Sequence, residues 1–374
     1  MKFALPLLCI YLLLAACNSA PKQQVVIKQQ RRSKTDTPQT KVSTPAGDTL
    51  SIVAVGDLMP GTSYPNKNTL PPDSGRNSFK HALNYLRNAD VAFGNLEGVL
   101  LDTGAAIDYK LRSKNKTYLF RIPTAYGALF KDAGFDALSL GNNHTNDFAA
   151  AGRKSTAKIL DSLGISYAGL KTHPAAIFTI KGIRYGFCAF SPNSQTASLV
   201  DIKGAKNLIS DLKSKCDIVV VSFHGGAEGV TFEHVPPGDE SYNGEYRGNV
   251  RLFTHAAVDA GADFIFGHGP HVVRGMEIYN KRLIAYSLGN FCTHSGVSVL
   301  GICGLAPLLK ITLNKKGEFL NGQIISYRQT HDKGTLRDTL NRAALRIKML
   351  TDSDFTAPGL SISSLGVITP LRGN

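Results

Sequence analysis

The stretch Ile52-Val53-Ala54-Val55-Gly56-Asp57 is an apolar run that ends in a glycine and a carboxylate. Such a run predicts a buried strand, and Asp57 would emerge where that strand reaches the surface. Four further apolar runs along the chain are each followed by a short polar segment of the same kind. Those segments are Gly94-Asn95-Leu96-Glu97, Gly141-Asn142-Asn143-His144, Phe223-His224-Gly225-Gly226 and Gly267-His268-Gly269-Pro270-His271. Because α/β sheets carry their chemistry at strand ends, the five segments predict one functional site.

From about residue 49 onward, apolar runs alternate with amphipathic stretches of helical spacing. The expected strands are 51–55, 91–93, 137–140, 188–190, 218–223, 264–266 and 283–287. The expected helices are 79–86, 125–133, 155–163, 205–212 and 250–260. Turn signals at Lys181-Gly182 and at 314–317 predict two hairpins, over 177–190 and over 308–327. Alternation with antiparallel pieces predicts an α/β fold with a mixed sheet, or two facing sheets.

The domain boundaries follow from composition. We expect a folded domain over 49–350 that closes with a helix over 335–349, and an irregular tail over 351–374. Four cysteines lie in this part of the chain. Cys188 and Cys216 sit in apolar strand contexts that favour buried free thiols. Cys292 and Cys303 are the nearest candidates for a disulfide in an oxidising compartment.

The first fifty residues predict export and attachment to a membrane. Lys2 precedes an apolar stretch over 3–16 whose end, Leu14-Ala15-Ala16-Cys17, resembles a bacterial lipobox. We expect a signal peptide over 1–16, lipid on Cys17, and an extracytoplasmic protein anchored at the periplasmic or cell-surface face. A plain secretory peptide with an incidental Cys17 is the alternative. Residues 17–48 are polar with few large apolar groups, which predicts a flexible basic tether.

The formal net charge of the chain is +14. A basic protein attracts anionic chains electrostatically, so an anionic polymer is one expected partner. Anionic lipid or wall material is an equally open reading of the same charge. No nucleic acid is expected, because no run of interleaved aromatic and basic residues is present. No segment after the signal peptide approaches ~20 uninterrupted apolar residues, so no further membrane span is predicted.

The polar segments supply oxygen and nitrogen donors suited to one or two divalent ions such as Mn, Fe or Zn. The six expected metal ligands are Asp57, Glu97, Asn143, His224, His268 and His271. Taken singly, each has an ordinary alternative, such as a turn or capping residue or a structural histidine. Five such segments in one chain favour the shared site.

Four other residues are expected to serve that site. His144 is a candidate general acid, because imidazole titrates near neutral pH, and Asp147 lies close enough to orient it. A polar turn with capping Asn and Asp residues is the alternative for this segment. Asn95 is expected to hydrogen-bond substrate or a ligand, and Glu228 to orient His224.

As a set, the motifs resemble those of the CapA group of capsule-biosynthesis proteins, which is associated with poly-γ-glutamate and is similar to calcineurin-like metallophosphatases in fold. The resemblance covers about residues 50–295. It rests on Gly56–Met59, Gly94–Gly98, Gly141–Asp147, His224–Glu228, Gly267–Val272 and Tyr286–Phe291. It implies a four-layer α/β/β/α sandwich with mixed sheets. It also implies Asp57, Glu97 and His271 at one ion, and Asn143, His224 and His268 with Glu97 at the other.

The chain departs from the metallophosphatase pattern at two positions. Met59 stands where a metal-binding His follows the first Asp, and thioether sulfur is a poor ligand for hard cations. Glu97 replaces the usual bridging Asp. CapA-like proteins share both changes, which leave the site of the first ion the weaker of the two.

The resemblance implies a metal-dependent hydrolase that acts on poly-γ-glutamate or an acidic capsule or wall polymer, with capsule synthesis or export machinery as partners. Met59 favours an alternative, a non-catalytic polymer-binding or export lipoprotein with a vestigial metal centre. His144 and Asp147 favour catalysis, because neither is needed to hold a metal. A secreted phosphoesterase or nucleotidase is disfavoured by the absence of the Asp-x-His opening.

Overall fold

A computed structural model of the chain describes residues 49–111, 118–331 and 333–371. The predicted signal peptide, Cys17 and the tether lie outside the described residues. Within the described ranges, every helix is too short or too polar to cross a bilayer.

Two mixed sheets form the centre of the described domain. The larger has the order β19-β20-β17-β16-β1-β2-β5-β6, with β15 beside β1 and β18 beside β17. Its strands are β1 (Thr49–Met59), β2 (Val91–Leu96), β5 (Ala137–Ser139), β6 (Ser166–Ala168), β15 (Asn290–Thr293), β16 (Leu305–Asn314), β17 (Phe319–Thr330), β18 (Gly334–Arg337), β19 (Leu360–Ile362) and β20 (Val367–Pro370). The smaller has the order β13-β14-β12-β9-β8-β7. Its strands are β7 (Ala175–Ile180), β8 (Ile183–Phe190), β9 (Ile218–His224), β12 (Phe264–His268), β13 (Met276–Tyr279) and β14 (Arg282–Ala285).

The remaining elements lie around these sheets. The helices are α1 (Leu83–Asn88), α2 (Asp108–Leu111), α3 (Gly127–Ala133), α4 (Ala149–Leu163), α5 (Ile202–Lys215), α6 (Val250–Asp259) and α7 (Arg342–Asp354). Two small ribbons pair β3 (Val99–Leu100) with β4 (Arg121–Ile122) and β10 (Glu240–Tyr242) with β11 (Glu245–Gly248). The short 3₁₀ turns are η1 (Lys67–Thr69), η2 (Thr124–Tyr126), η3 (Val230–Phe232) and η4 (Gly301–Gly304).

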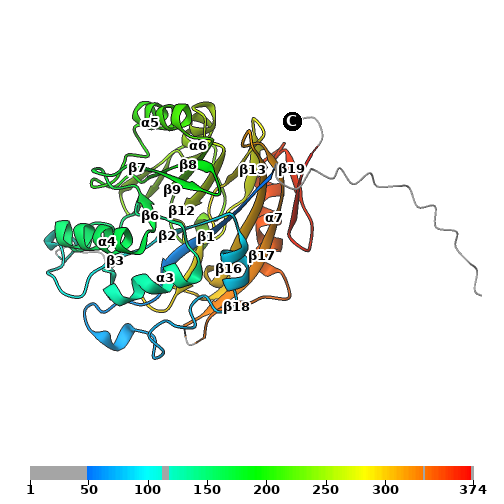
Figure 1. The fold of residues 1–374 in the computed structure, drawn as a ribbon. Coiled ribbons are helices and arrows are strands. Elements are labelled where there is room, and N and C mark those ends of the chain that lie inside the picture. The colour runs from blue at the N-terminus through cyan, green and yellow to red at the C-terminus, as the bar shows by residue number, and fades with distance from the viewer. Residues whose placement is uncertain (1–48, 112–117, 332, 372–374) are drawn as a thin grey trace, which may run out of the picture. The chain divides into compact units, whose positions relative to one another are not determined.

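The layers follow from the apolar runs, because a strand that is apolar on both faces must be covered on both. Ile52 and Ala54 of β1 enter the core between the two sheets, where Phe93 meets Phe187 with ring centroids 5.1 Å apart. The alternate residues Val53 and Val55 pack in a second core with α3 and α4. A third core lies between the smaller sheet and α5 and α6. Figure 1 shows these helices on opposite sides of the strands, which confirms the predicted four-layer α/β/β/α sandwich.

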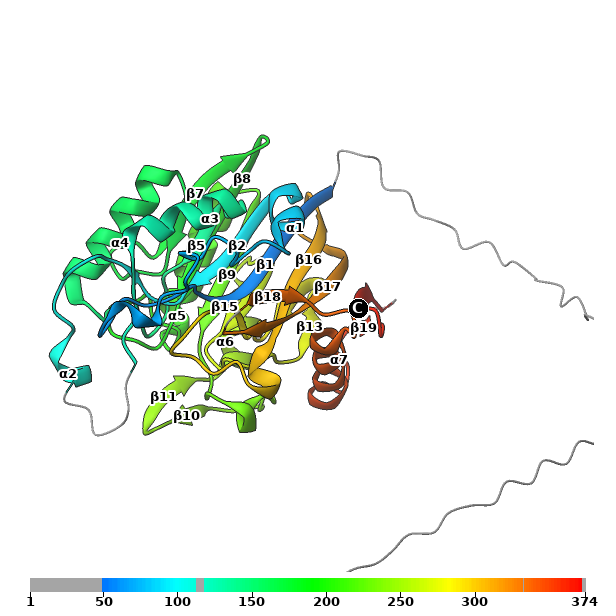
Figure 2. The ribbon, with the colours of Figure 1, turned by 90° about the horizontal axis from the view of Figure 1, so that it is seen from below.

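The C-terminal part differs from the prediction. Residues 334–337 are β18, and α7 begins only at Arg342, because the Asp338 carboxylate accepts hydrogen bonds from the backbone N–H groups of Leu340 and Arg342. The expected irregular tail is wrong, since β19 and β20 extend the larger sheet through pairing of β20 with β17. Figure 2 shows α7 beside β13 and β17, where its buried face packs into the core between the sheets.

Other local predictions have mixed outcomes. Both hairpins are confirmed, as β7–β8 and β16–β17. The helix expected over 79–86 begins at Leu83, because the residues before it form successive tight turns. All four cysteines in the described residues are free thiols, so the expected pairing of Cys292 with Cys303 is not formed. Cys188 is fully buried and Cys216 half-buried.

Candidate metal centre

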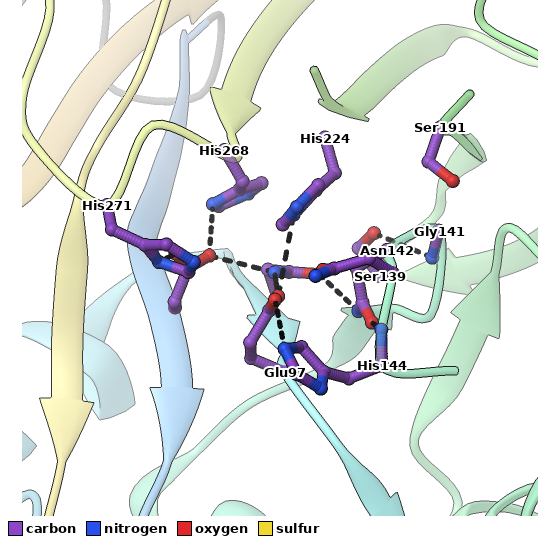
Figure 3. A network of polar contacts seen from close by, with 12 residues as sticks. Glu97, Ser139, Gly141, Asn142, His144, Ser191, His224, His268 and His271 are labelled. Atoms are coloured by element: carbon purple, nitrogen blue, oxygen red, sulfur yellow. Dashed lines mark hydrogen bonds and ion pairs between the residues drawn. The ribbon is translucent and has the colours of Figure 1, made fainter. Parts of the chain in front are cut away.

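Two pairs of parallel strands, one in each sheet, end at the same place in the fold. In the larger sheet Asp57 of β1 pairs in register with Asn95 of β2. In the smaller sheet His224 of β9 pairs in register with His268 of β12. Figure 3 shows the imidazole of His224 reaching toward Glu97, which follows β2, with the imidazole of His268 beside it. His268 faces Asp57. The stacked sheets thereby gather donors from distant parts of the chain.

Asp57 is buried at a close approach of two backbone segments. A Cβ at Gly56 would lie 2.1 Å from the carbonyl oxygen of Gly289, so only glycine allows this strand end. Asp57 Oδ2 lies 2.9 Å from Nδ1 of His271, and Oδ1 lies 3.2 Å from Nδ1 of His268. Burial would raise the pKa of the Asp57 carboxyl, but the two imidazoles outweigh it and hold the pKa well below its usual range.

Glu97 is a second buried carboxylate beside Asp57. The amide of Asn95 donates to Asp57 Oδ1 at 2.8 Å and to Glu97 Oε2 at 2.5 Å, so it bridges the two. The oxygen of that amide accepts from Asn142 Nδ2 at 3.0 Å. Burial and, next, the charge of Asp57 raise the pKa of Glu97 well above its usual value. A nearby cation would relieve both effects.

Several buried donor atoms at this site lack a hydrogen bond of regular geometry in the described residues, although His268 Nδ1 lies 3.2 Å from Asp57 Oδ1. They are Glu97 Oε1, Asn143 Oδ1 and both ring nitrogens of His224 and of His268. Buried polar atoms are almost always paired, so a local group of unpaired ones calls for an explanation. All of these atoms belong to predicted metal ligands. The oxygens of Glu97 and Asn143 and one ring nitrogen of each neutral imidazole offer lone pairs that fit a bound cation.

The spacing and chemistry of the donors fit the same ion. Single ligand atoms of Asp57, Glu97 and His224 all lie within 4.8 Å of one another. Burial lowers the pKa of His224 well below its usual value, which keeps the imidazole in the neutral, metal-binding form. Three imidazoles, two carboxylates and one amide oxygen suit Mn, Fe or Zn.

His271 closes the cluster from the side and is less buried than the other two histidines. Its Nδ1 also lies 3.1 Å from Asn290 Oδ1, on the strand next to β1. Burial lowers the pKa of His271, but Asp57 more than offsets this and raises it to about 10. A proton therefore competes with any cation at this imidazole.

His144 and Asp147 form a dyad next to the cluster. His144 Nδ1 lies 2.8 Å from Asp147 Oδ2, while Nε2 lies 3.8 Å from Glu97 Oε1. The ring stacks on Phe120 with centroids 4.1 Å apart. Burial lowers the pKa of His144, and Asp147 offsets part of that shift. Asp147 is itself held by an ion pair with Lys110 and by the backbone N–H of Phe120.

Three of the contributing residues were not predicted from sequence. Asn142 holds Asn95, Asn290 holds His271, and Lys110 holds Asp147. Asn142 and Asn290 lie inside motifs that were recognised, so their position was a usable signal. Lys110 sits in a stretch that carries no motif, and only the fold brings it to the dyad.

Glu228 and Met59 do not contact the histidines of the metal cluster in the way that a ligand or an orienting residue would. Glu228 pairs with Arg247 at 2.5 Å, and both nitrogens of His224 lack a hydrogen-bond partner, so the expected contact between Glu228 and His224 is wrong. Glu228 instead lines a cavity of about 630 Å³ together with Asn143, His144 and His271. The Met59 side chain is fully buried among apolar residues of the core that β1 shares with α3 and α4. It offers no ligand.

The sequence also matches known proteins. Residues 51–295 match the family model described as bacterial capsule synthesis protein PGA_cap. This chain belongs to that family. It is 31% identical over 267 residues to the capsule biosynthesis protein CapA of Bacillus anthracis, covering 66% of this chain and 60% of that protein. It is 30% identical over 282 residues to the PGA biosynthesis protein CapA of Bacillus subtilis strain 168, and the match covers 70% of this chain and 68% of that protein.

Membership of the PGA_cap family confirms the resemblance drawn from the motifs. The chain thus spans about 60% of the length of the Bacillus anthracis relative. Among solved structures, a 5′-nucleotidase precursor from Thermus thermophilus superposes with a TM-score of 0.40 and 15% identity, covering 82% of this chain and 59% of that one.

Proposed function

We propose that this capsule-synthesis family member is a metal-dependent hydrolase that cuts an anionic polymer outside the cytoplasm. The observation that carries the proposal is the group of unpartnered donor atoms on Glu97, Asn143, His224 and His268. Asn143 also lines a cavity, together with His144 and His271, that is large enough for part of a polymer chain. A bound divalent ion of the Mn, Fe or Zn type supplies Lewis acidity and lowers the pKa of bound water.

The protein's own contribution is a positioned proton donor. Asp147 accepts the Nδ1 proton of His144, which fixes the tautomer and leaves Nε2 on the side of Glu97. In the protonated form, His144 delivers the Nε2 proton to the leaving atom of the scissile bond, and in the neutral form Nε2 takes a proton up again. Lys110 keeps Asp147 ionised and in place. Stacking on Phe120 holds the ring plane.

The substrate class follows from charge and from the names of the relatives. PGA and capsule biosynthesis are what the two Bacillus proteins are named for, and we extend to this chain an acidic capsule or wall polymer such as poly-γ-glutamate. The net charge of +14 would draw such a polymer to the protein. The polymer's synthesis or export machinery is the corresponding partner.

Attachment to a membrane through Cys17 is part of the proposal and rests on the lipobox-like Leu14-Ala15-Ala16-Cys17. Growth with a labelled fatty acid should label the full chain and leave Cys17→Ser unlabelled. Equal labelling of both would exclude an anchor at this residue.

A second candidate function is a polymer-binding or export protein without catalysis. It is favoured by Met59, which is buried among apolar residues and leaves one expected ligand position empty of a donor. The two functions differ in what they require of His144, because a binding protein has no use for a proton donor.

The test compares the full chain with His144→Gln after loading with Mn²⁺. Release of small fragments from poly-γ-glutamate and from phosphoester substrates is measured beside metal content. Loss of a general acid costs about 10²- to 10⁴-fold in rate, and we expect a loss of that size with unchanged metal content. A metal-loaded wild-type protein that releases nothing, or a variant that keeps the wild-type rate, would establish the binding protein instead.

A further inference from the structure

A second, larger cavity adjoins the one at the metal centre. Its volume is about 960 Å³, against about 630 Å³ at the centre. The two cavities have six lining residues in common, so they lie side by side. The shared residues are Lys110, Tyr118, Phe120, Gly296, Val297 and Ser298. Phe120 is also the ring on which His144 stacks, which places the junction of the two cavities beside the catalytic dyad.

The chemistry of the outer cavity differs from that of the inner one. The inner cavity includes in its lining the carboxylates of Glu228 and Glu245 and the guanidinium of Arg247, which pairs with both. None of the described residues that line the outer cavity is an Asp or a Glu, while the cation of Lys110 stands at its inner end. Its lining otherwise combines amide, hydroxyl and imidazole groups with apolar surface. Representative members are Asn68, Thr69, Tyr64, Leu119, His294 and His331.

Those properties select a particular ligand. A wall without carboxylates accepts negative groups without like-charge repulsion. Apolar surface interspersed with hydroxyls and amides suits a chain of methylene and amide groups. A small substrate, unlike a polymer, would need no second cavity beside the one that holds the reacting bond.

We propose that the outer cavity is a binding subsite for the uncut part of an anionic polymer whose scissile bond lies at the metal centre. The proposal rests on the proposed hydrolase function and adds the place and the chemical class of the neighbouring units, which carry carboxylates on an amide-linked backbone. Binding of remote units is then used to hold the scissile bond in place.

The test uses the full chain loaded with Mn²⁺ and γ-linked glutamate oligomers of increasing length. Equilibrium dialysis measures affinity, and a chromogenic single-unit γ-glutamyl anilide measures hydrolysis without the outer cavity. Asn68 and His331 are exposed residues of the outer cavity outside the dyad and the metal cluster. Asn68→Glu with His331→Glu places two carboxylates in the wall, and Asn68→Gln with His331→Gln is the matched neutral control.

We expect affinity to rise with oligomer length and then level off. The Glu pair should weaken binding of long oligomers roughly tenfold at low salt, with single-unit hydrolysis unchanged and the Gln pair close to wild type. Length-independent affinity, or equal affinity of the Glu and Gln pairs for long oligomers, would overturn the subsite. Length-dependent binding without hydrolysis of any substrate would support the subsite and refute the hydrolase.

Discussion

His271 is held in a backbone conformation that residues other than glycine seldom adopt. Its φ is 55°, in the left-handed region. Strain of this kind persists at functional sites when the surroundings fix it. Asn290 does so from two directions, because Nδ2 donates to the His271 carbonyl at 3.1 Å and Oδ1 faces Nδ1 of its ring.

Replacing Asn290 should therefore weaken metal binding without unfolding the protein. We expect Asn290→Ala to lower affinity for Mn²⁺ about 10- to 100-fold, the usual effect of losing a residue that orients a ligand. Competition with a chelator measures this. Asn84→Ala, at an exposed position of α1, is the control and should bind as wild type does. Equal affinity of the two variants would contradict the role given to Asn290.

Glu277 is a buried carboxylate remote from the metal cluster. Burial would raise its pKa, but hydrogen bonds with His255 at 2.7 Å and Tyr286 at 2.6 Å lower it below its usual value. A carboxyl whose folded-state pKa is depressed stabilises the fold above its unfolded pKa, roughly 4.3, and loses that contribution as pH falls further.

Glu277→Gln should then be destabilised most near neutral pH. We expect a loss of about 1–3 kcal/mol at pH 7 that shrinks below about pH 4. Urea unfolding across this pH range measures it, with the exposed Glu245→Gln as control. A loss of the same size at every pH would show that the charge of Glu277 is not what matters.

At the scale of helices and strands, the sequence is sufficient to predict the central strands and the hairpins. Runs that are apolar at every position, such as Ile52–Val55 and Ile218–Val221, correctly predict central strands, because such runs must be buried on both faces. The hairpins followed from turn residues at fixed places. The polar segments after these strands gave the metal cluster, since parallel strand ends meet at one edge of a sheet.

The short C-terminal strands show where sequence was insufficient. Leu360 and Ile362 are buried and Ser361 is exposed, an alternation over only three residues. So short a pattern is no stronger than chance until β20 offers a pairing partner. The same holds for Lys110, whose contact with Asp147 depends on tertiary packing. Glu228 is near His224 in sequence, but its partner in space is Arg247, so sequence distance alone predicts its contact wrongly.

The start of α7 offers a test at this scale. Both oxygens of Asp338 accept hydrogen bonds from backbone N–H groups and from the guanidinium of Arg342, so this carboxylate holds the turn that leads into the helix. We expect Asp338→Ala to cost about 1–2 kcal/mol of unfolding free energy, and Asp338→Asn less. Equilibrium denaturation measures both. Two variants as stable as wild type would mean that packing alone sets this helix boundary.

At the scale of the whole molecule, the metal cluster joins the two sheets. Asp57 and Glu97 come from one sheet and His224 and His268 from the other, so an ion bound between them would tie the layers together. The same donors without a cation leave two carboxylates buried side by side, which is costly. Function and stability thus depend on one set of side chains.

Diffraction from crystals of the full chain grown with Mn²⁺, recorded at a wavelength where manganese scatters anomalously, tests this most directly. The expected result is an anomalous peak enclosed by Glu97, Asn143, His224 and His268. A well-ordered fold with no peak among these residues, at a Mn²⁺ concentration that saturates ordinary protein sites, would contradict the account.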